Sequence, residues 1–296
     1  MTFDDIHKID LHMHTRISDG SDTLEELLVH LREAGVQLFS VTDHDGIRGS
    51  MEMPLLLEAG APWFIRGVEF SCKDTEGKYH ILGYGYDPEH PAIQNLVEKG
   101  HGFRIDKTRA RLDYLKEEFG FTFPQDEIDE LFAQSNPGKP HIAKMMIRHG
   151  YAKTIPEAIV GYLDGKQFVG RHVAPDETIA AILESGGIPV LAHPAYGSGD
   201  EVVLGRDLTE RLERLMEFGL AGVEAYYSGF TDLIQRQILR LADEYDLYVT
   251  AGSDYHGPVR MADLGDTNLE DAAEGPEGLK RFLNDVKIIR PQAEED

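Results

Sequence analysis

The chain has 296 residues, 41% of them hydrophobic, which is enough for one barrel-sized domain or two smaller ones. Its formal net charge of −24 argues against an extended nucleic-acid surface, because an acidic protein repels the phosphate backbone. Cys72 is the one cysteine, which excludes an intrachain disulfide and fits a reducing compartment. The acidic N-terminus lacks a signal-peptide pattern and no apolar run approaches the roughly 20 residues that span a bilayer, so we expect a cytoplasmic protein without membrane contact.

The first strand and its loop, residues 9–20, carry a pair of histidines. Alternate side chains of a strand share a face, so His12 and His14 lie on one side, with Asp10 behind them. Asp19 in the following loop can add a carboxylate oxygen. This arrangement predicts half of a metal site.

Strand and helix patterns then alternate along the chain. Helical spacing at 24–34 and 47–58 is followed by apolar strands at 38–41 and 63–68, which predicts an α/β fold with a mostly parallel sheet. A turn at 74–77 and a strand at 80–84 predict a hairpin that interrupts the alternation.

The strand pattern disappears between residues 88 and 173, where short helices are expected at 93–119, 125–133, 140–148 and 155–163. We therefore expect a barrel formed by 1–87 and 174–296, with 88–173 as a helical insertion over the active-site face. The alternation resumes with helices near 175–185, 208–218 and 231–245 and strands at 188–192, 222–226 and 247–252.

Metal-binding residue types follow the carboxyl ends of most of these strands. In a parallel barrel these ends meet at one rim, where closure also brings the first and last strands together. The sequence therefore predicts one metal centre from His12, His14, Asp19, His44, Glu69, His80, His193, Asp254 and His256. Asp43 and Asp45 are better placed as helix caps or hydrogen-bond acceptors than as ligands.

The motifs at 10–15 with 18–20, 42–45, 67–69, 191–194 and 252–257 resemble the PHP (polymerase and histidinol phosphatase) superfamily. The resemblance covers roughly residues 8–86 and 176–260 and implies a distorted (β/α)7 barrel with a trinuclear metal centre. It assigns the first metal to His12, His14, Glu69 and Asp254. It assigns the second to Glu69, His80 and His193, and the third to Asp19, His44 and His256. Imidazole and carboxylate ligands without thiolate suit two or three divalent Mn, Fe or Zn ions.

Residues 138–143 of the insertion resemble the branch of stand-alone phosphoesterases, which act on nucleoside monophosphates such as AMP, on 3′,5′-nucleoside bisphosphates, or on the 5′ ends of short RNA. The implied partner is a small phosphorylated substrate. The implied reaction is hydrolysis of a phosphate monoester by in-line attack of a metal-bridging hydroxide, without a covalent enzyme intermediate.

Lys139, His141 and Arg171 are candidates for binding a second phosphate or the far end of the substrate. Members of this branch commonly carry arginine where this chain has Lys139, and lysine attracts phosphate only as a point charge. The alternatives are a histidinol-phosphate phosphatase, which the same metal rim would serve, and a non-catalytic metal-binding or sensor protein. The oligomeric state and the acid that protonates the leaving group stay open.

Overall fold

The computed structural model describes residues 5–134, 136–166, 168, 170–196, 202–258 and 262–291. The chain forms two compact units, one from Met1–Val97 with Val173–Asp296 and the other from Glu98–His172. The second unit therefore begins ten residues later than the expected insertion at 88, because the start of its long first helix belongs with the barrel. Placement of the insertion over the active-site face stays a prediction.

The first unit is built on an eight-stranded sheet in which β1 to β7 follow one another in chain order and β8 pairs with β3. β1, β2 and β3 are parallel, as are β5, β6 and β7, while β4 is antiparallel to both β3 and β5. The predicted hairpin is thus confirmed as the β3–β4 pair. The strands are Ile9–Asp10 (β1), Leu38–Val41 (β2), Trp63–Lys73 (β3), Lys78–Tyr84 (β4), Ile188–Leu191 (β5), Gly222–Tyr227 (β6), Tyr248–Gly252 (β7) and Ile288–Ile289 (β8).

Backbone hydrogen bonds join the two ends of this sheet. Leu11 N–H donates to the Ala251 carbonyl at 2.9 Å, and His14 N–H donates to the Tyr255 carbonyl at 2.8 Å. The segment after β1 therefore lies beside β7 and its following loop. The result is the expected distorted (β/α)7 barrel, with β4 as the antiparallel strand that departs from a regular barrel.

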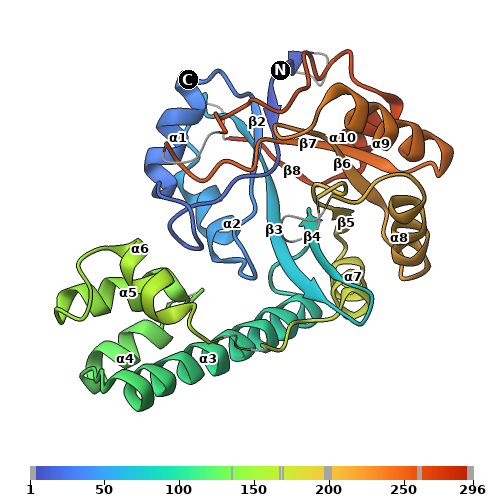
Figure 1. The fold of residues 1–296 in the computed structure, drawn as a ribbon. Helices are drawn as coiled ribbons and strands as arrows, with labels where there is room; N and C mark the ends of the chain where they lie inside the picture. The colour runs from blue at the N-terminus through green and yellow to red at the C-terminus, as the bar shows by residue number, and fades with distance from the viewer. Residues whose placement is uncertain are drawn as a thin grey trace. The chain divides into compact units, whose positions relative to one another are not determined.

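Helices cover the outside of the strands, with α1 and α2 on one side and α8, α9 and α10 on the other (Figure 1). In α1 a reciprocal capping box between Thr23 and Glu26 starts the helix, and its leucines are buried at helical spacing. The helices of this unit are Leu24–Glu33 (α1), Arg48–Glu52 (α2), Pro175–Glu184 (α7), Gly205–Glu217 (α8), Asp232–Glu244 (α9) and Glu277–Asp285 (α10). A 3-10 turn, Met53–Leu56, follows α2.

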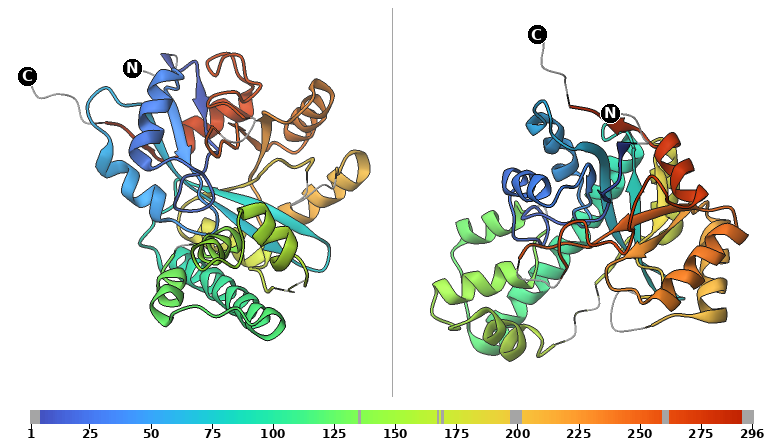
Figure 2. Two further views of the ribbon diagram at one scale, coloured as in Figure 1. Left: turned by 60° about the vertical axis from the view of Figure 1, so that its left-hand side comes forward. Right: turned by 90° about the horizontal axis from the view of Figure 1, so that it is seen from above.

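The second unit is a small helical bundle, drawn in green in Figure 2. Its own core includes Leu115, Ile142 and Met146, all buried, with Phe121 stacked on Tyr151 beside it. Its helices are Pro91–Phe119 (α3, which starts in the first unit), Gln125–Phe132 (α4), Lys139–Arg148 (α5) and Ile155–Ala158 (α6), continued by a π-helical turn Ile159–Leu163. Among the described residues, no helix is both long and apolar enough to cross a membrane.

Candidate metal centre

The nine residues proposed as ligands all belong to the first unit, and the fold places them at or next to the strand ends. His44 follows β2 and forms an isolated bridge with Glu69 of β3, which aligns the two neighbouring strands. His80 lies on β4, paired with Ser71 of β3. His12 and His14 follow β1, Asp19 is in the next loop, His193 follows β5, and Asp254 and His256 follow β7.

Glu69 is the residue on which the others converge. Its carboxylate is 1% exposed, and Oε2 lies 3.3 Å from His12 Nε2, 3.2 Å from His14 Nε2 and 3.1 Å from His44 Nδ1. These histidines come from the segments after β1 and β2, so one oxygen of Glu69 contacts residues from two segments of the rim.

The other oxygen of Glu69 faces two further imidazoles. Oε1 lies 2.8 Å from His80 Nδ1 and 3.3 Å from His193 Nε2. One carboxylate thus contacts five of the six predicted histidine ligands, through both oxygens. Such a position suits a bridging ligand that is shared between neighbouring cations.

Two more carboxylates complete the cluster. Asp254 Oδ1 lies 3.1 Å from His14 Nε2 and 3.4 Å from His12 Nε2. Asp19 Oδ1 lies 3.3 Å from His256 Nε2. Ligand atoms within 4.8 Å of one another form three groups that could each hold an ion: His14, Asp19, His44 and His256; His12, His14 and Asp254; and His44, Glu69 and His80.

Several of these atoms are buried and still make no hydrogen bond. They are His12 Nε2, both ring nitrogens of His14, His44 Nδ1, Glu69 Oε2, His80 Nδ1 and His256 Nε2. A buried polar atom left unsatisfied costs about 1–3 kcal/mol. These atoms are close to one another but are not directed at one another as donor and acceptor are. Divalent cations between them would satisfy the whole set, so the donor set fits bound metal ions.

The electrostatics of the cluster also favour bound cations. Burial disfavours charge on His14, but the adjacent carboxylates of Asp254 and Glu69 outweigh it and raise the pKa of His14 to about 10. Burial likewise opposes ionisation of Glu69, but His80, His12 and His44 hold its pKa well below the usual range. Burial lowers the pKa of His44 to about 4. The carboxylates therefore require positive charge beside them, which protons or metal ions can supply.

Backbone strain occurs at two of the same residues. His193 has φ of 29° and Asp254 has φ of 57°, in the left-handed region that residues other than glycine rarely occupy. Strain of this kind persists only where surrounding contacts hold it, and it clusters at functional sites.

The comparisons with known proteins agree with this geometry. No family model matches the sequence. The chain is 30% identical to phosphoribosyl 1,2-cyclic phosphate 1,2-diphosphodiesterase from Eggerthella lenta, over 84% of this chain and 94% of that protein. It is 30% identical to 3′,5′-nucleoside bisphosphate phosphatase from Chromobacterium violaceum, over 96% and 98%. It is 29% identical to a 5′-3′ exoribonuclease from Haemophilus influenzae, over 87% and 93%.

Solved structures also match nearly the whole chain. One is a protein from Bifidobacterium adolescentis assigned as a metal-dependent phosphoesterase, with a TM-score of 0.74, 26% identity and coverage of 94% of this chain and 96% of that chain. Another is called an amidohydrolase, from Chromobacterium violaceum, with a TM-score of 0.75, 27% identity and coverage of 96% and 98%.

The chain belongs to the PHP superfamily. It is a metal-dependent phosphoesterase of the stand-alone branch, a hydrolase that acts on phosphoric ester bonds. The resemblance of the five sequence motifs to this family is thereby confirmed.

Buried carboxylates outside the predicted ligand set hold the loops of this PHP enzyme. Asp43 accepts hydrogen bonds from Thr15 N–H and Thr15 Oγ1, both at 2.8 Å, and from Ser18 Oγ at 2.6 Å, which fixes the loop that carries Asp19. Asp45 accepts from Ser71 N–H at 2.7 Å. Both therefore act as hydrogen-bond acceptors, as expected from the sequence.

Two side chains near the centre lie outside the set of residues predicted from the sequence. Glu224 of β6 accepts from His193 N–H and contacts His12 Nδ1, and Tyr227 Oη donates to Asp254 Oδ2 at 3.1 Å. A signal for Glu224 existed, because it is the one charged residue in the predicted strand at 222–226. Tyr227 had no comparable signal, since a tyrosine just past a strand is ordinary.

The three candidate substrate-binding residues belong to the insertion unit, and two of them already have carboxylate partners there. Lys139, at the start of α5, forms an ion pair with Asp164. Arg171 forms an ion pair with Asp106 at 2.7 Å and lies over the ring of Phe103.

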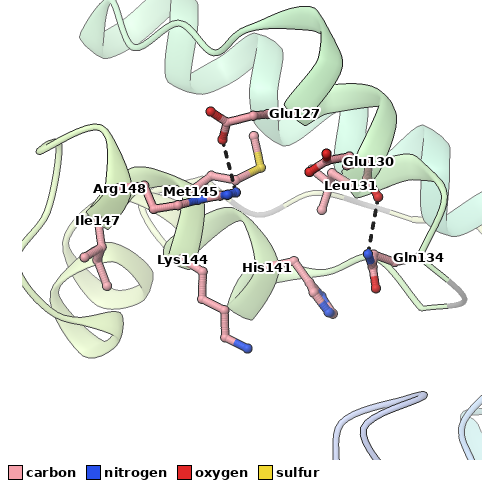
Figure 3. A pocket seen from close by; sticks show the side chains of 9 residues that line it. All are labelled: Glu127, Glu130, Leu131, Gln134, His141, Lys144, Met145, Ile147 and Arg148. Carbon is pink, nitrogen blue, oxygen red and sulfur yellow. Dashed lines mark hydrogen bonds and ion pairs between the residues drawn. The ribbon is translucent and has the colours of Figure 1, made fainter.

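His141, the third candidate, lines a cavity of about 510 Å³ within the insertion. Figure 3 shows its ring and Lys144 projecting from the same side of α5. His141 Nδ1 is buried and makes no hydrogen bond, and burial lowers the pKa of this histidine. A neutral imidazole here could donate to or accept from a bound group.

Proposed function

We propose that this phosphoesterase hydrolyses a nucleotide phosphate monoester, with AMP, a 3′,5′-nucleoside bisphosphate or the 5′ end of a short RNA as substrate. The names of the Chromobacterium and Haemophilus relatives support this substrate class over histidinol phosphate. The observation that carries the proposal is the convergence of five imidazoles on Glu69, with their facing nitrogens and one oxygen largely unsatisfied.

We assign two or three divalent Mn, Fe or Zn ions to this cluster. The first ion would take His12, His14, Glu69 and Asp254, and the third would take Asp19, His44 and His256. The second would take Glu69, His80 and His193, so that Glu69 is shared. The cluster of imidazoles and carboxylates without a thiolate supports metals of this class.

When bound, such ions supply Lewis acidity that neutralises phosphoryl oxygens and acidifies water. The protein's own residues prepare the place for that chemistry. His12 and His14 are fully buried, so their ring nitrogens face the cluster without competition from solvent. Cys72 is an unsuitable nucleophile, because its thiol is buried, donates to Thr178 Oγ1 at 3.3 Å, and has a pKa raised by burial.

Lys139, His141 and Arg171 would bind the part of the substrate away from the reacting ester. Lys139 and Arg171 would exchange Asp164 and Asp106 for phosphate oxygens, and the Arg171 guanidinium can bind such oxygens in a bidentate manner. The side chain of Arg171 is 70% exposed, which leaves it accessible to a ligand.

A phosphate-release panel with AMP, a 3′,5′-bisphosphate, a 5′-phosphorylated short RNA and histidinol phosphate tests the proposal. We expect release from at least one nucleotide in the presence of Mn or Zn, with metal analysis showing more than one ion per chain. Release from histidinol phosphate alone would support the alternative enzyme. Bound metal without release from any of the four would support the sensor protein.

We also propose a cytoplasmic location and no extended nucleic-acid surface. The single cysteine and the net charge of −24 support these two points. Fractionation of the producing cell, and binding to long RNA at low salt, would test them.

A further inference from the structure

Glu224 is a charged side chain in the interior of the barrel unit. It lies in β6, is 0% exposed, and is flanked by the buried residues Val223 and Ala225. A buried carboxylate is costly unless its oxygens are hydrogen-bonded, so its partners show what it does.

Both partners of Glu224 are predicted metal ligands. Oε1 lies 2.9 Å from His12 Nδ1, and Oε2 accepts a hydrogen bond from the backbone N–H of His193 at 2.8 Å. Since a carboxylate can only accept, His12 Nδ1 carries a proton, and the lone pair of Nε2 is left for the cluster. His12 Nε2 is the atom that lies 3.3 Å from Glu69 Oε2.

The hydrogen bond to His193 acts on a strained backbone. His193 has φ of 29°, and in this conformation its ring Nε2 lies 3.3 Å from Glu69 Oε1. Glu224 therefore fixes the ring of one ligand and the backbone of another, which come from the segments after β1 and β5.

Packing holds Glu224 against His12 from the side of β7. A Cβ atom added at Gly252 would lie 2.5 Å from Glu224 Oε1, so only glycine leaves room for the contact. The carboxylate is thus confined by the neighbouring strand as well as by its hydrogen bonds.

We propose that Glu224 is a positioning residue of the metal centre, which sets the tautomer of His12 and the backbone of His193 for metal binding. This inference rests on the proposed metal centre. Carboxylates that hold metal-bound histidines in this way typically change metal affinity by about 10–100-fold when they are mutated.

Glu224→Gln is the informative substitution, because one of its two oxygens becomes an NH2 group that faces an N–H donor. Glu127→Gln is the matched control. Glu127 Oε1 lies 2.8 Å from His149 Nε2, so Glu127 is also a carboxylate beside a histidine, but both residues belong to the insertion and lie outside the cluster. Metal dissociation constants and stoichiometry of wild type and both variants would be measured by calorimetry with Zn²⁺ and Mn²⁺.

We expect Glu224→Gln to weaken metal binding at least about 10-fold, and Glu127→Gln to bind as wild type does. An unchanged Tm of metal-free Glu224→Gln, together with a smaller metal-induced rise in Tm than in wild type, would exclude a merely structural loss. Wild-type affinity in Glu224→Gln, or an equal loss in Glu127→Gln, would overturn the inference. Failure of the wild type itself to bind metal would instead overturn the proposed metal centre.

A second measurement uses the wild type alone, so it does not depend on whether a variant folds. In the zinc-loaded wild type, the ¹⁵N shifts of His12 should show Nδ1 protonated and Nε2 without a proton. A proton on His12 Nε2, with Nδ1 bare, would overturn the inference.

Discussion

The barrel unit and the insertion differ sharply in charge. The insertion, residues 98–172, holds 12 of the 29 Lys and Arg residues but only 11 of the 53 Asp and Glu residues, so it is close to neutral. The barrel unit, with the other 17 basic and 42 acidic residues, has a net charge of −25 and so carries all of the net negative charge. The proposed metal centre, which would act on an anionic phosphate ester, thus lies in the unit whose negative charge would repel that substrate more strongly.

Buried carboxylates beside the predicted ligands explain part of the negative charge of the barrel unit. Asp10, Asp43, Glu69 and Glu224 are each at most 1% exposed, and each touches a predicted ligand or the loop that carries one. Cations held by this set would reverse the local sign of charge, whereas the insertion has no such cluster among its described residues. With the proposed ions bound, the barrel could act on an anionic substrate despite its charge, and the near-neutral insertion would repel such a substrate less.

Removal of divalent metal should have the largest effect on activity, because it removes the positive charge that the cluster would present to a phosphate. We expect a chelator to eliminate phosphate release and Mn²⁺ or Zn²⁺ to restore it, as measured with any substrate of the panel. Full activity after exhaustive chelation, with no metal found by elemental analysis, would contradict the proposed centre.

The pH dependence of metal binding follows from the same cluster. His14 has a pKa raised to about 10 from the ordinary 6.5, so the metal-free protein holds a proton there at pH 7. This proton stabilises the metal-free fold fully below pH 6.5, and the contribution is lost as pH rises towards 10. Metal must displace it, so we expect proton release on binding at pH 7 and tighter binding as pH rises. Calorimetry in buffers of different ionisation enthalpy would detect the release, and its absence would contradict this expectation.

Glu69→Gln should reduce activity more than any substitution in the insertion. The amide has no negative charge and only one acceptor oxygen, so it cannot contact five imidazoles and bind shared cations as the carboxylate would. We expect a loss of kcat/KM of more than about 100-fold, which exceeds the effect typical of mutating a residue that only hydrogen-bonds a metal ligand. Glu76→Gln, in the exposed turn between β3 and β4, is the control. A loss below 10-fold in Glu69→Gln would argue that the cluster is not the site of reaction.

The barrel could be predicted from the sequence, and the residues of the proposed metal centre could be placed at its strand ends, because strands and their ends follow local patterns. Strand periodicity located β2 and β5, and His44 and His193 follow those strands directly. Glu224 was missed because its role depends on contacts with residues 212 and 31 positions away, which no local pattern encodes. The positive φ of His193 could not be predicted either, since no residue type at 192–194 requires it.

The start of the insertion was less predictable than its helical character. α3 is a continuous helix, Pro91–Phe119, that begins in one compact unit and ends in the other. Helical spacing gives no signal at such a boundary, because the periodicity does not change where the packing partner does.

The two units can be compared by stability as well as by charge. Ile142→Ala removes a fully buried side chain from the insertion core, and we expect a loss of about 2–5 kcal/mol in its free energy of unfolding. Val160→Ala, at a side chain 71% exposed, should change it by less than about 0.5 kcal/mol. Urea denaturation followed by circular dichroism, and by fluorescence of the single Trp63 in β3, separates the units. An equal shift of both transitions in Ile142→Ala would show that the units unfold together.

Lys139→Ala should have the smallest effect and should act on binding rather than on chemistry. Lys139 is 35% exposed and already paired with Asp164, and an exposed charge of this kind contributes about 0–1 kcal/mol, or up to roughly 5-fold in KM. We expect KM for a 3′,5′-bisphosphate to rise within this range while kcat stays unchanged, and hydrolysis of a small aryl phosphate to be unaffected. Lys153→Ala, at an exposed lysine of the same unit, is the control. Equal losses with the aryl phosphate and the bisphosphate would mean that Lys139 does not distinguish substrates. Only two of the three residues proposed to give the insertion a role in substrate selection would then remain.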